Sequence, residues 1–168
     1  MPKTVNYHET DKYIFFYGSY FSKWAMRDIE IDGIVYNCCE QAMMAEKAKL
    51  FKDDYALKNI MESKNPSLQK SWGRKVKNFN KEKWEKEAKK IVYKANYAKF
   101  TQHKDLKKKL LDTKDKIIVE ASPYDCIWGI GMSCDAKGIE DPKNWRGTNW
   151  LGEVIMKVRK TIRKEKNE

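Results

Sequence analysis

Hydrophobic and polar residues follow two different periods along the chain, and each period predicts one kind of element. Near the N-terminus, YIFFYGSY (residues 13–20) and IEIDGIVY (residues 29–36) are rich in aromatic and β-branched residues. They predict short strands, the second with an Asp32-Gly33 turn inside it. A small antiparallel sheet is expected from these two segments. Residues 117–120 form a further β-branched run that is compatible with a strand.

Most of the remaining chain has a helical period. Apolar residues recur every three or four positions, and the predicted helices are residues 39–50, 54–62, 66–72, 80–99, 103–111 and 148–162. The segment 122–149 is rich in Gly, Pro, Asp and Asn, and a connection of that length is rarely a simple linker. The expected architecture is one α+β domain, mostly helical around a small antiparallel sheet. Its parts are an N-terminal arm (1–12), the domain (13–162) and a basic tail (163–168).

The stretch CCEQAMMAEKAKLF (residues 38–51) places charged residues inside an apolar helix. On a helix Glu40, Met43, Met44 and Lys47 fall at i, i+3, i+4 and i+7, so they share one face. Both charged groups are therefore expected to be partly buried. A buried lysine loses its proton more easily and becomes a usable nucleophile. The structural alternative is a buried ion pair, or a lysine that reaches solvent and serves packing alone.

Charge is concentrated in the middle of the chain. The net charge is +11, and residues 58–116 hold 19 Lys and Arg against 7 Asp and Glu, while the rest holds 16 against 17. A face this basic is a plausible site for phosphates or nucleic acid, because Lys and Arg displace counterions from a polyanion. A solvated, lysine-rich helix surface is the alternative, since Glu82, Glu85 and Glu87 can pair at helical spacing.

Cysteine spacing and the N-terminal sequence bear on cofactors and localisation. Cys38 and Cys39 are adjacent, whereas Cys126 and Cys134 stand alone, so metal-ligand spacing is missing and reduced, mostly buried thiols are expected. Neither a metal nor a cofactor is expected. The chain has no run of 18 apolar residues, and MPKTVNYHETDKY lacks the apolar segment of a signal peptide. A soluble, intracellular, cytoplasmic protein is expected.

Three further stretches hold candidate binding residues. SWGRKVKNF places Arg74 just beyond a helix, where a planar guanidinium can clamp a phosphate or carboxylate. SPYDCIWGIGM sets Asp125 and Trp128 in a turn, which suits an acid and an aromatic lid over a flat base. NWRGTNWLGEVIMKVR offers Thr148 and Asn149 as N-caps of a helix whose first N–H groups can face an anion. A surface arginine, a core tryptophan and an ordinary cap are the structural alternatives.

Taken in order, these stretches resemble the NADAR (YbiA-like) superfamily of N-glycosidases over about residues 15–159. The resemblance is carried by FYGSYFSKW, the helix from Glu40 to Lys47, Gly73-Arg74, YAKFTQHKDLKKKLLDT, Asp125 with Trp128-Gly129, and TNWLGEVIMKVR. It implies a YbiA-like α+β fold and hydrolysis of the C1′–N bond of a ribosyl group. The family's substrates are riboflavin-pathway intermediates and ADP-ribose attached to guanine bases.

The chain also departs from the family pattern. Many bacterial members have SEHYFQAQKF where this chain keeps Glu40 and Lys47 but carries Met43 and Met44 between them. The insert MSCDAKGIEDPKNWRG replaces a shorter turn rich in Gly and Lys. The two residues that carry the chemistry are thus retained, while the surroundings that would recognise the base differ.

The resemblance implies a mechanism. A neutral Lys47 attacks C1′, the ribose ring opens, and a Schiff base forms that water later hydrolyses. Glu40 would hold or deprotonate Lys47, and Asp125 or Glu46 would shuttle protons to the leaving base and from water. The other expected contacts are Arg74 on phosphate, Trp128 on a base, and Ser19, Phe21, Asn149 and Gly152 in the ribose and phosphate pocket. No metal is required.

The expected substrate is an ADP-ribosylated guanine, in nucleic acid or as a nucleotide. One alternative is a hydrolase of N-ribosyl riboflavin-pathway metabolites. Another is a non-catalytic module that binds ADP-ribose or nucleic acid, and a plain lysine-rich structural domain is a third. Neither a membrane nor an obligate protein partner is expected.

Overall fold

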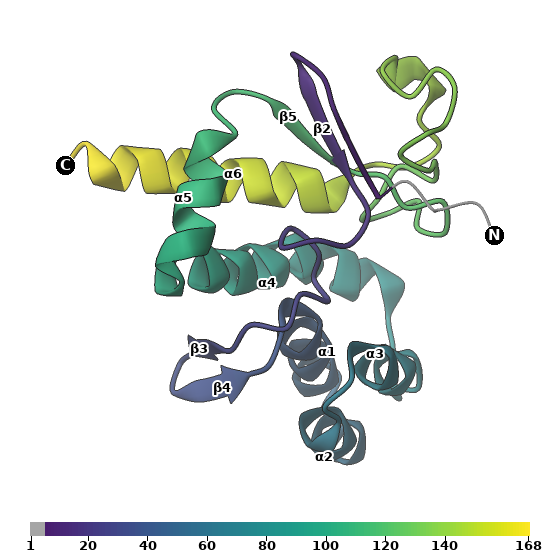
Figure 1. Ribbon diagram of the computed structural model, residues 1–168. Coiled ribbons are helices and arrows are strands. Elements are labelled where there is room, and N and C mark those ends of the chain that lie inside the picture. Colours follow the sequence, from purple (N-terminus) through teal and green to yellow (C-terminus); the bar gives the residue numbers. More distant parts are fainter. Residues whose placement is uncertain (1–5) are drawn as a thin grey trace. The chain divides into compact units, whose positions relative to one another are not determined.

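The computed structural model describes residues 6–168, and the chain divides into two structural units (Figure 1). One unit, here called the helical unit, is Lys23–His103. The other, the sheet unit, combines the residues up to Ser22 with Lys104–Glu168. Each unit is described by itself.

The helical unit contains one hairpin and four helices. They are β3 (Ile29–Ile31), β4 (Ile34–Tyr36), α1 (Cys39–Leu50), α2 (Asp54–Glu62), α3 (Pro66–Arg74) and α4 (Lys81–Gln102). The hairpin turns at Asp32-Gly33, where both residues have positive φ, as a two-residue hairpin turn of this kind requires. Helix α1 packs against α2, α3 and α4. Most of its side chains are therefore buried, and Ala, Cys and Met suit that position because they are small or flexible.

Side-chain caps fix the ends of these helices. Asp53, Asn65 and Asn80 accept backbone N–H groups at the starts of α2, α3 and α4. The buried Gln41 of α1 donates to the carbonyl oxygens of Ile60, Met61 and Ser63. It thus satisfies carbonyls at the end of α2 that lack partners within the helix. A glutamine inside the apolar α1 stretch is explained by this role.

The sheet unit is built on three strands. It contains β1 (Tyr7–Glu9), β2 (Tyr13–Phe16), α5 (Lys104–Asp112), β5 (Ile117–Glu120), a short 3-10 helix η1 (Pro142–Asn144) and α6 (Trp150–Lys166). The strand order is β1-β2-β5, with β1 antiparallel and β5 parallel to β2. Helix α6 packs against β5.

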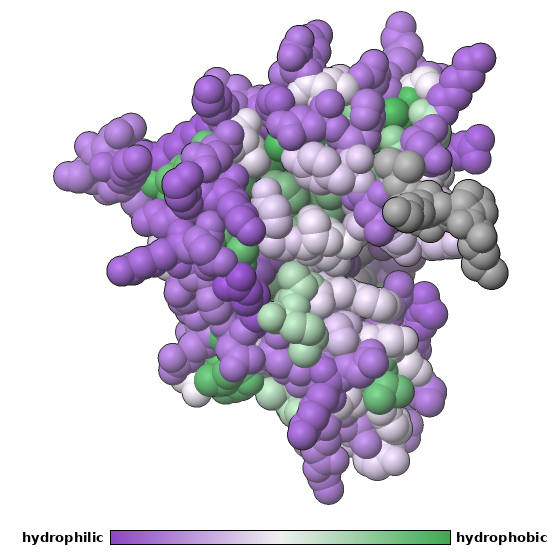
Figure 2. Space-filling view, viewed as in Figure 1, coloured by the Kyte–Doolittle hydropathy of each residue, from purple (hydrophilic) through white to green (hydrophobic). Residues whose placement is uncertain are grey.

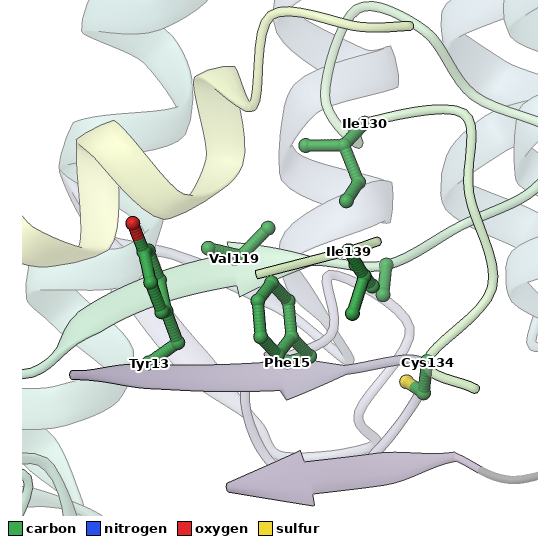
Figure 3. Close-up of a cluster of buried hydrophobic side chains, with 7 residues drawn as sticks. Tyr13, Phe15, Val119, Ile130, Cys134 and Ile139 are labelled. Carbon is green, nitrogen blue, oxygen red and sulfur yellow. The ribbon is translucent and has the colours of Figure 1, made fainter. Parts of the chain in front are cut away.

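The long segment between β5 and α6 contributes to the core of the sheet unit. Ile130, Cys134 and Ile139 from this segment pack with Phe15 of β2 and Val119 of β5 (Figure 3). The ring of Trp145 meets the ring of Phe15 edge-on. The expectation that this segment is more than a linker is therefore confirmed, because its side chains complete a hydrophobic cluster.

The α+β class and its helical majority are confirmed, and so are the positions of all six predicted helices. The purely antiparallel sheet is wrong, because β2 pairs with β5 in parallel while β3 and β4 pair with each other. Both β2 and β5 are buried almost throughout, which is typical of parallel strands covered on both faces.

The division into an N-terminal arm, a domain and a basic tail stays a prediction, and both ends contain regular structure. Part of the expected N-terminal arm forms β1 at residues 7–9, and residues 1–5 of the arm lie outside the described residues. Helix α6 continues to Lys166, so most of the expected tail is helical.

Figure 2 shows a face that is mainly hydrophilic, with scattered hydrophobic residues. Within residues 6–168, the helices are too short or too polar to span a bilayer. Cys38, Cys39 and Cys134 are buried free thiols, as expected, and Cys126 is exposed.

Candidate active site

Helix α1 places Glu40 and Lys47 on the face where sequence spacing predicted them. Glu40 is 2% exposed, and Met43 and Met44 are buried beside it. Lys47 is half-buried, one helical turn beyond Met44. The predicted burial of both charged residues is confirmed. Burial is deeper for the carboxylate than for the amine.

Gly73 allows helix α3 to approach α1 closely. A Cβ atom at this position would overlap the Sδ of Met44, so the Met44 side chain would have to move. The close packing of α3 against α1 therefore explains why position 73 is a glycine. The same contact brings Arg74, the last residue of α3, into electrostatic range of Lys47.

Two aromatic rings lie beneath the amine of Lys47. Its Nζ is 4.7 Å from the centroid of the Phe79 ring and 5.6 Å from that of Trp84. Rings at this distance stabilise a cation while shielding it from water. Sequence analysis missed both rings, although Phe79 lies in the quoted SWGRKVKNF stretch.

The loop that carries Phe79 is held by Asp53. One carboxylate oxygen of Asp53 accepts the N–H of Ala56 at 3.0 Å and so caps α2, and the other accepts the N–H of Lys77 at 2.9 Å. These hydrogen bonds hold the pKa of Asp53 below its usual value. One acidic residue thus fixes both the start of α2 and the loop under Lys47.

Burial favours a neutral Lys47. Burial is the main cause that lowers the pKa of Lys47 below the ordinary lysine value. Glu40 acts in the opposite direction, and the Arg74 charge adds a smaller lowering effect. An amine that loses its proton more easily is a better nucleophile at neutral pH. The site can therefore supply an amine for attack on an electron-poor carbon.

Glu40 forms an ion pair with a residue that sequence analysis did not single out. Its Oε2 lies 3.9 Å from the Nζ of Lys23, and the two side chains are 2% and 8% exposed. The backbone N–H of Glu40 also donates to the carbonyl oxygen of Lys23 at 2.9 Å. The sequence signal that could have pointed to Lys23 was its position within FYGSYFSKW, one of the stretches that carry the family resemblance.

Glu46 lies away from the Glu40–Lys47 face. Its carboxylate is 3.0 Å from the Nζ of Lys49, which also donates to the hydroxyl of Tyr36. Glu46 and Tyr36 line a small cavity of about 50 Å³ together with Lys94 of α4. The role of Glu46 in proton transfer stays a prediction.

A basic groove of about 530 Å³ borders this part of the helical unit. Its lining residues are Leu50, Phe51, Lys52, Asn78, Asn80, Glu82, Lys83 and Lys86. The ring of Phe51 meets Phe79 edge-on with centroids 5.4 Å apart, and the Nζ of Lys83 lies 5.9 Å from the Phe51 ring. The rings of Phe51 and Phe79, here called the aromatic wall, therefore connect the groove with the amine of Lys47.

In the sheet unit, Asp125 shapes the turn that carries Trp128. One of its carboxylate oxygens accepts the N–H groups of Ile127 and Trp128 at 2.9 and 2.8 Å. Trp128 is buried, and its ring stands edge-on to Trp150 with centroids 5.6 Å apart. The structure thus brings Asp125 and Trp128 together, and their roles toward a substrate stay predictions.

Asn149 stands at the N-cap position of α6, but its side chain does not cap the helix. Its amide donates to the carbonyl oxygen of Ile118 and accepts the N–H of Glu120, both at 3.0 Å. A Cβ at Gly152 would overlap that carbonyl oxygen of Ile118. Asn149 and Gly152 therefore join α6 closely to β5.

The first N–H groups of α6 are already hydrogen-bonded. Trp150 donates to the carbonyl of Ile127 and Leu151 to that of Trp128. The hydroxyl of Thr148 also donates to the carbonyl of Ile127, at 2.7 Å. The predicted side-chain cap is therefore wrong, because backbone carbonyls of the preceding turn occupy these donors.

Ser19 and Phe21 follow β2. Gly18 and Ser19 both have positive φ, and the exposed Ser19 accepts the N–H of Phe21 through its hydroxyl oxygen at 3.4 Å. Phe21 is fully buried against the rings of Phe16 and Tyr20. The predicted contacts of Ser19 and Phe21 with substrate stay predictions.

The predicted site residues divide between the two units. Glu40, Lys47 and Arg74 come together in the helical unit, which also holds Glu46; the sheet unit holds Ser19, Phe21, Asp125, Trp128, Asn149 and Gly152. Among residues 6–168, no three His, Cys, Asp or Glu side chains are grouped as a metal site would require.

Comparison with known proteins identifies the family. The NADAR domain model matches residues 6–163. N-glycosidase R617 of Acanthamoeba polyphaga mimivirus is 44% identical over 165 residues, covering 90% of this chain and 96% of that protein. N-glycosidase YbiA of Escherichia coli (strain K12) is 29% identical over 146 residues, covering 87% and 82%. The NMR structure of E. coli YbiA matches with a TM-score of 0.78 and 28% identity, covering 98% of this chain and 92% of that chain. The chain therefore belongs to the NADAR family, as a YbiA-like N-glycosidase.

Proposed function

We propose that this N-glycosidase removes ADP-ribose from guanine bases, in nucleic acid or nucleotides, through a Schiff base on Lys47. The observation that carries the proposal is the environment of Lys47. Its amine is half-buried above two rings and has a lowered pKa, with Arg74 and Glu40 in electrostatic range. A surface lysine that served solubility alone would not be desolvated in this way.

The reaction follows from that amine. The lone pair of Lys47 attacks C1′, and the C1′–N bond breaks with its electron pair passing to the base, which takes a proton from a positioned acid. The amine then loses its proton, the ribose ring opens, and a Schiff base joins Nζ to C1′. Water adds to this Schiff base and releases the sugar, which restores the amine. Asp125 and Glu46 are the proposed proton carriers for the leaving base and the water.

The basic groove supports a polyanionic substrate. Lys52, Lys83 and Lys86 line it, and its aromatic wall leads to the amine of Lys47. Lysines beside rings suit phosphates and stacked bases on either side of a modified nucleotide. Arg74, exposed at the end of α3, is the proposed contact for the phosphates of ADP-ribose itself.

The test is a set of ribosides with covalent trapping. The protein is incubated with an ADP-ribosylated guanine oligonucleotide, the matching nucleotide and N-ribosyl riboflavin-pathway intermediates, and the released base is measured. Borohydride added during turnover should leave a reduced sugar adduct that peptide mass spectrometry places on Lys47. Lys47→Ala should lose nearly all activity while staying folded, and Lys49→Ala should keep it.

The outcomes separate the possible substrates and mechanisms. Release from a riboflavin-pathway intermediate alone would replace the proposed substrate but keep the chemistry. An adduct elsewhere, or an active Lys47→Ala protein, would refute the Schiff base. Binding of ADP-ribose or oligonucleotide without release of any base would mean a non-catalytic module.

A further inference from the structure

Lys23 and Glu40 form a buried pair at the start of α1. Besides the 3.9 Å contact between Nζ and Oε2, the carbonyl oxygen of Lys23 accepts the backbone N–H of Glu40. The Nζ of Lys23 also lies 3.9 Å from the Sδ of Met43, one helical turn along α1. One residue thus holds the backbone and the side chain of Glu40 and is itself fixed against α1.

Stability alone does not explain this pair. Burying two charges costs their hydration, and their mutual attraction commonly just offsets that cost, so apolar residues of the same size hold a core equally well. Apolar packing against Met43 was available at this position, since Met43, Met44 and Ala42 are all buried there. Keeping a charged pair is better explained by a need for an ionised, oriented carboxylate.

The charge of Lys23 also affects the balance between Glu40 and Lys47. A carboxylate near an amine favours the protonated amine, and Glu40 does raise the pKa of Lys47. An uncompensated Glu40 would therefore oppose the neutral state that a nucleophile needs. A cation paired with Glu40 offsets part of this effect and leaves the carboxylate ionised.

We propose that Lys23 is a positioning residue for the glycosidase reaction: it holds the Glu40 carboxylate ionised and oriented, while Lys47 remains available as the nucleophile. The inference rests on the proposed roles of Glu40 and Lys47. It adds a third residue to the reaction, one that acts through Glu40 and does not touch the sugar.

Other titratable groups also lie close to Glu40. Cys38 and Cys39 flank it on the chain, and burial raises the pKa of both thiols, so they stay neutral. Lys99 of α4 and Lys23 both act to lower the pKa of Cys39, and burial lowers the pKa of Lys99 itself.

Two charged groups act on Lys47. Arg74 of α3 lowers the pKa of Lys47, whereas Glu40 raises it. Lys23 forms an ion pair with Glu40 and is buried with it.

The experiment measures the Glu40 carboxylate directly and through turnover. Protein labelled with ¹³C at glutamate carboxyl carbons is titrated by NMR, with Glu40→Gln used to assign the signal. The variants are Lys23→Met, which removes the charge, Lys23→Arg, which keeps it, and Lys58→Met as a control at an exposed lysine of α2. The pH dependence of kcat and of kcat/KM is recorded for each with a riboside that the wild type cleaves.

Loss of the ammonium should raise the pKa of Glu40. An opposite charge in contact favours the ionised carboxylate, so its removal should shift the titration upward by about one unit or more. Because Glu40 acts in its ionised form, the acid limb of the rate profile should move to higher pH by the same amount. At neutral pH we expect Lys23→Met to lower kcat and to leave KM little changed. Lys23→Arg should recover most of the wild-type profile, and Lys58→Met should match it throughout.

Each result decides the inference. A Glu40 titration that does not move, or one that moves without the acid limb, would overturn it and leave the pair a structural feature. If Lys23→Met does not fold, Lys23→Gln, which keeps a polar head without charge, takes its place under the same criteria. A wild type that releases no base from any riboside would overturn the proposed function and this inference together, whereas an active wild type with an unmoved profile in the variant overturns the inference alone.

Discussion

The guanidinium of Arg74 and the amine of Lys47 lie in electrostatic range of each other because Gly73 lets α3 touch α1. The contact between the two helices is so close that any side chain at Gly73 would meet Met44. Arg74 then helps to lower the pKa of Lys47, after burial as the main cause. A packing contact thus contributes to the reactivity of an amine.

Removing the charge of Arg74 should make Lys47 harder to deprotonate. The guanidinium lowers the pKa of Lys47, so Arg74→Gln should raise it, and the fraction of neutral amine at neutral pH should fall. Competitive acetylation of lysines across a pH series measures this without a substrate. The midpoint for Lys47 should move to higher pH, while that of the exposed Lys58 should stay where it is. Equal midpoints in both proteins would contradict the electrostatic role of Arg74.

Glu40→Gln should move the same midpoint in the opposite direction. The carboxylate raises the pKa of Lys47, so its removal should lower that pKa and shift the acetylation midpoint to lower pH. Turnover should nevertheless fall, by about 10² or more, because the variant lacks a positioned acid-base group. A rate and a pH profile equal to those of the wild type would mean that Glu40 is structural only.

Gly73→Ala should destabilise the helical unit through one contact. Alanine favours a helix by about 1 kcal/mol over glycine, but forcing a methyl group into packed side chains costs about 1–3 kcal/mol. Urea unfolding should show a net loss of stability, whereas Ser71→Ala, at an exposed position of the same helix, should be nearly neutral. In a double-mutant cycle, Met44→Ala should reduce the cost of Gly73→Ala, since the clashing atom is gone. Additive free energies would refute the contact.

Local sequence signals were sufficient for the helices and for the Glu40–Lys47 face. Periodicity and capping residues act within a few positions, as at Asn65 and Asn80, which are the N-caps of α3 and α4. The spacing of Glu40 and Lys47 likewise needed only the geometry of one helix. These features could be predicted because each depends on neighbours along the chain.

The missed features depend on residues that are distant in sequence. The parallel partner of β2 is β5, about a hundred residues later, and a run of β-branched residues does not indicate which strand it pairs with. Phe79 reaches Lys47 because Asp53 binds the N–H of Lys77, 24 positions away. Asn149 was expected to cap α6, yet it binds the backbone of β5. Local rules were overridden here by tertiary hydrogen bonds.

The basic groove separates nucleic-acid substrates from small ones through the salt dependence of cleavage. If the modified base belongs to an oligonucleotide, Lys83 and Lys86 should bind phosphates beside it. Each lysine–phosphate pair should then add about 0.7 to the slope of log kcat/KM against log salt for a single strand. The measurement compares an ADP-ribosylated oligonucleotide with the matching mononucleotide across a salt series. We expect the oligonucleotide to show the steeper slope.

Paired lysine variants show whether the groove produces that slope. Lys83→Gln with Lys86→Gln should flatten the slope for the oligonucleotide and leave the mononucleotide nearly unaffected, because a mononucleotide lacks the phosphates of neighbouring nucleotides. Lys58→Gln with Lys64→Gln removes the same charge from exposed positions outside the groove and should change the slope much less. Equal slopes for the two substrates, or equal effects of the two variant pairs, would mean that the groove lysines are merely solvated and the substrate is a small metabolite.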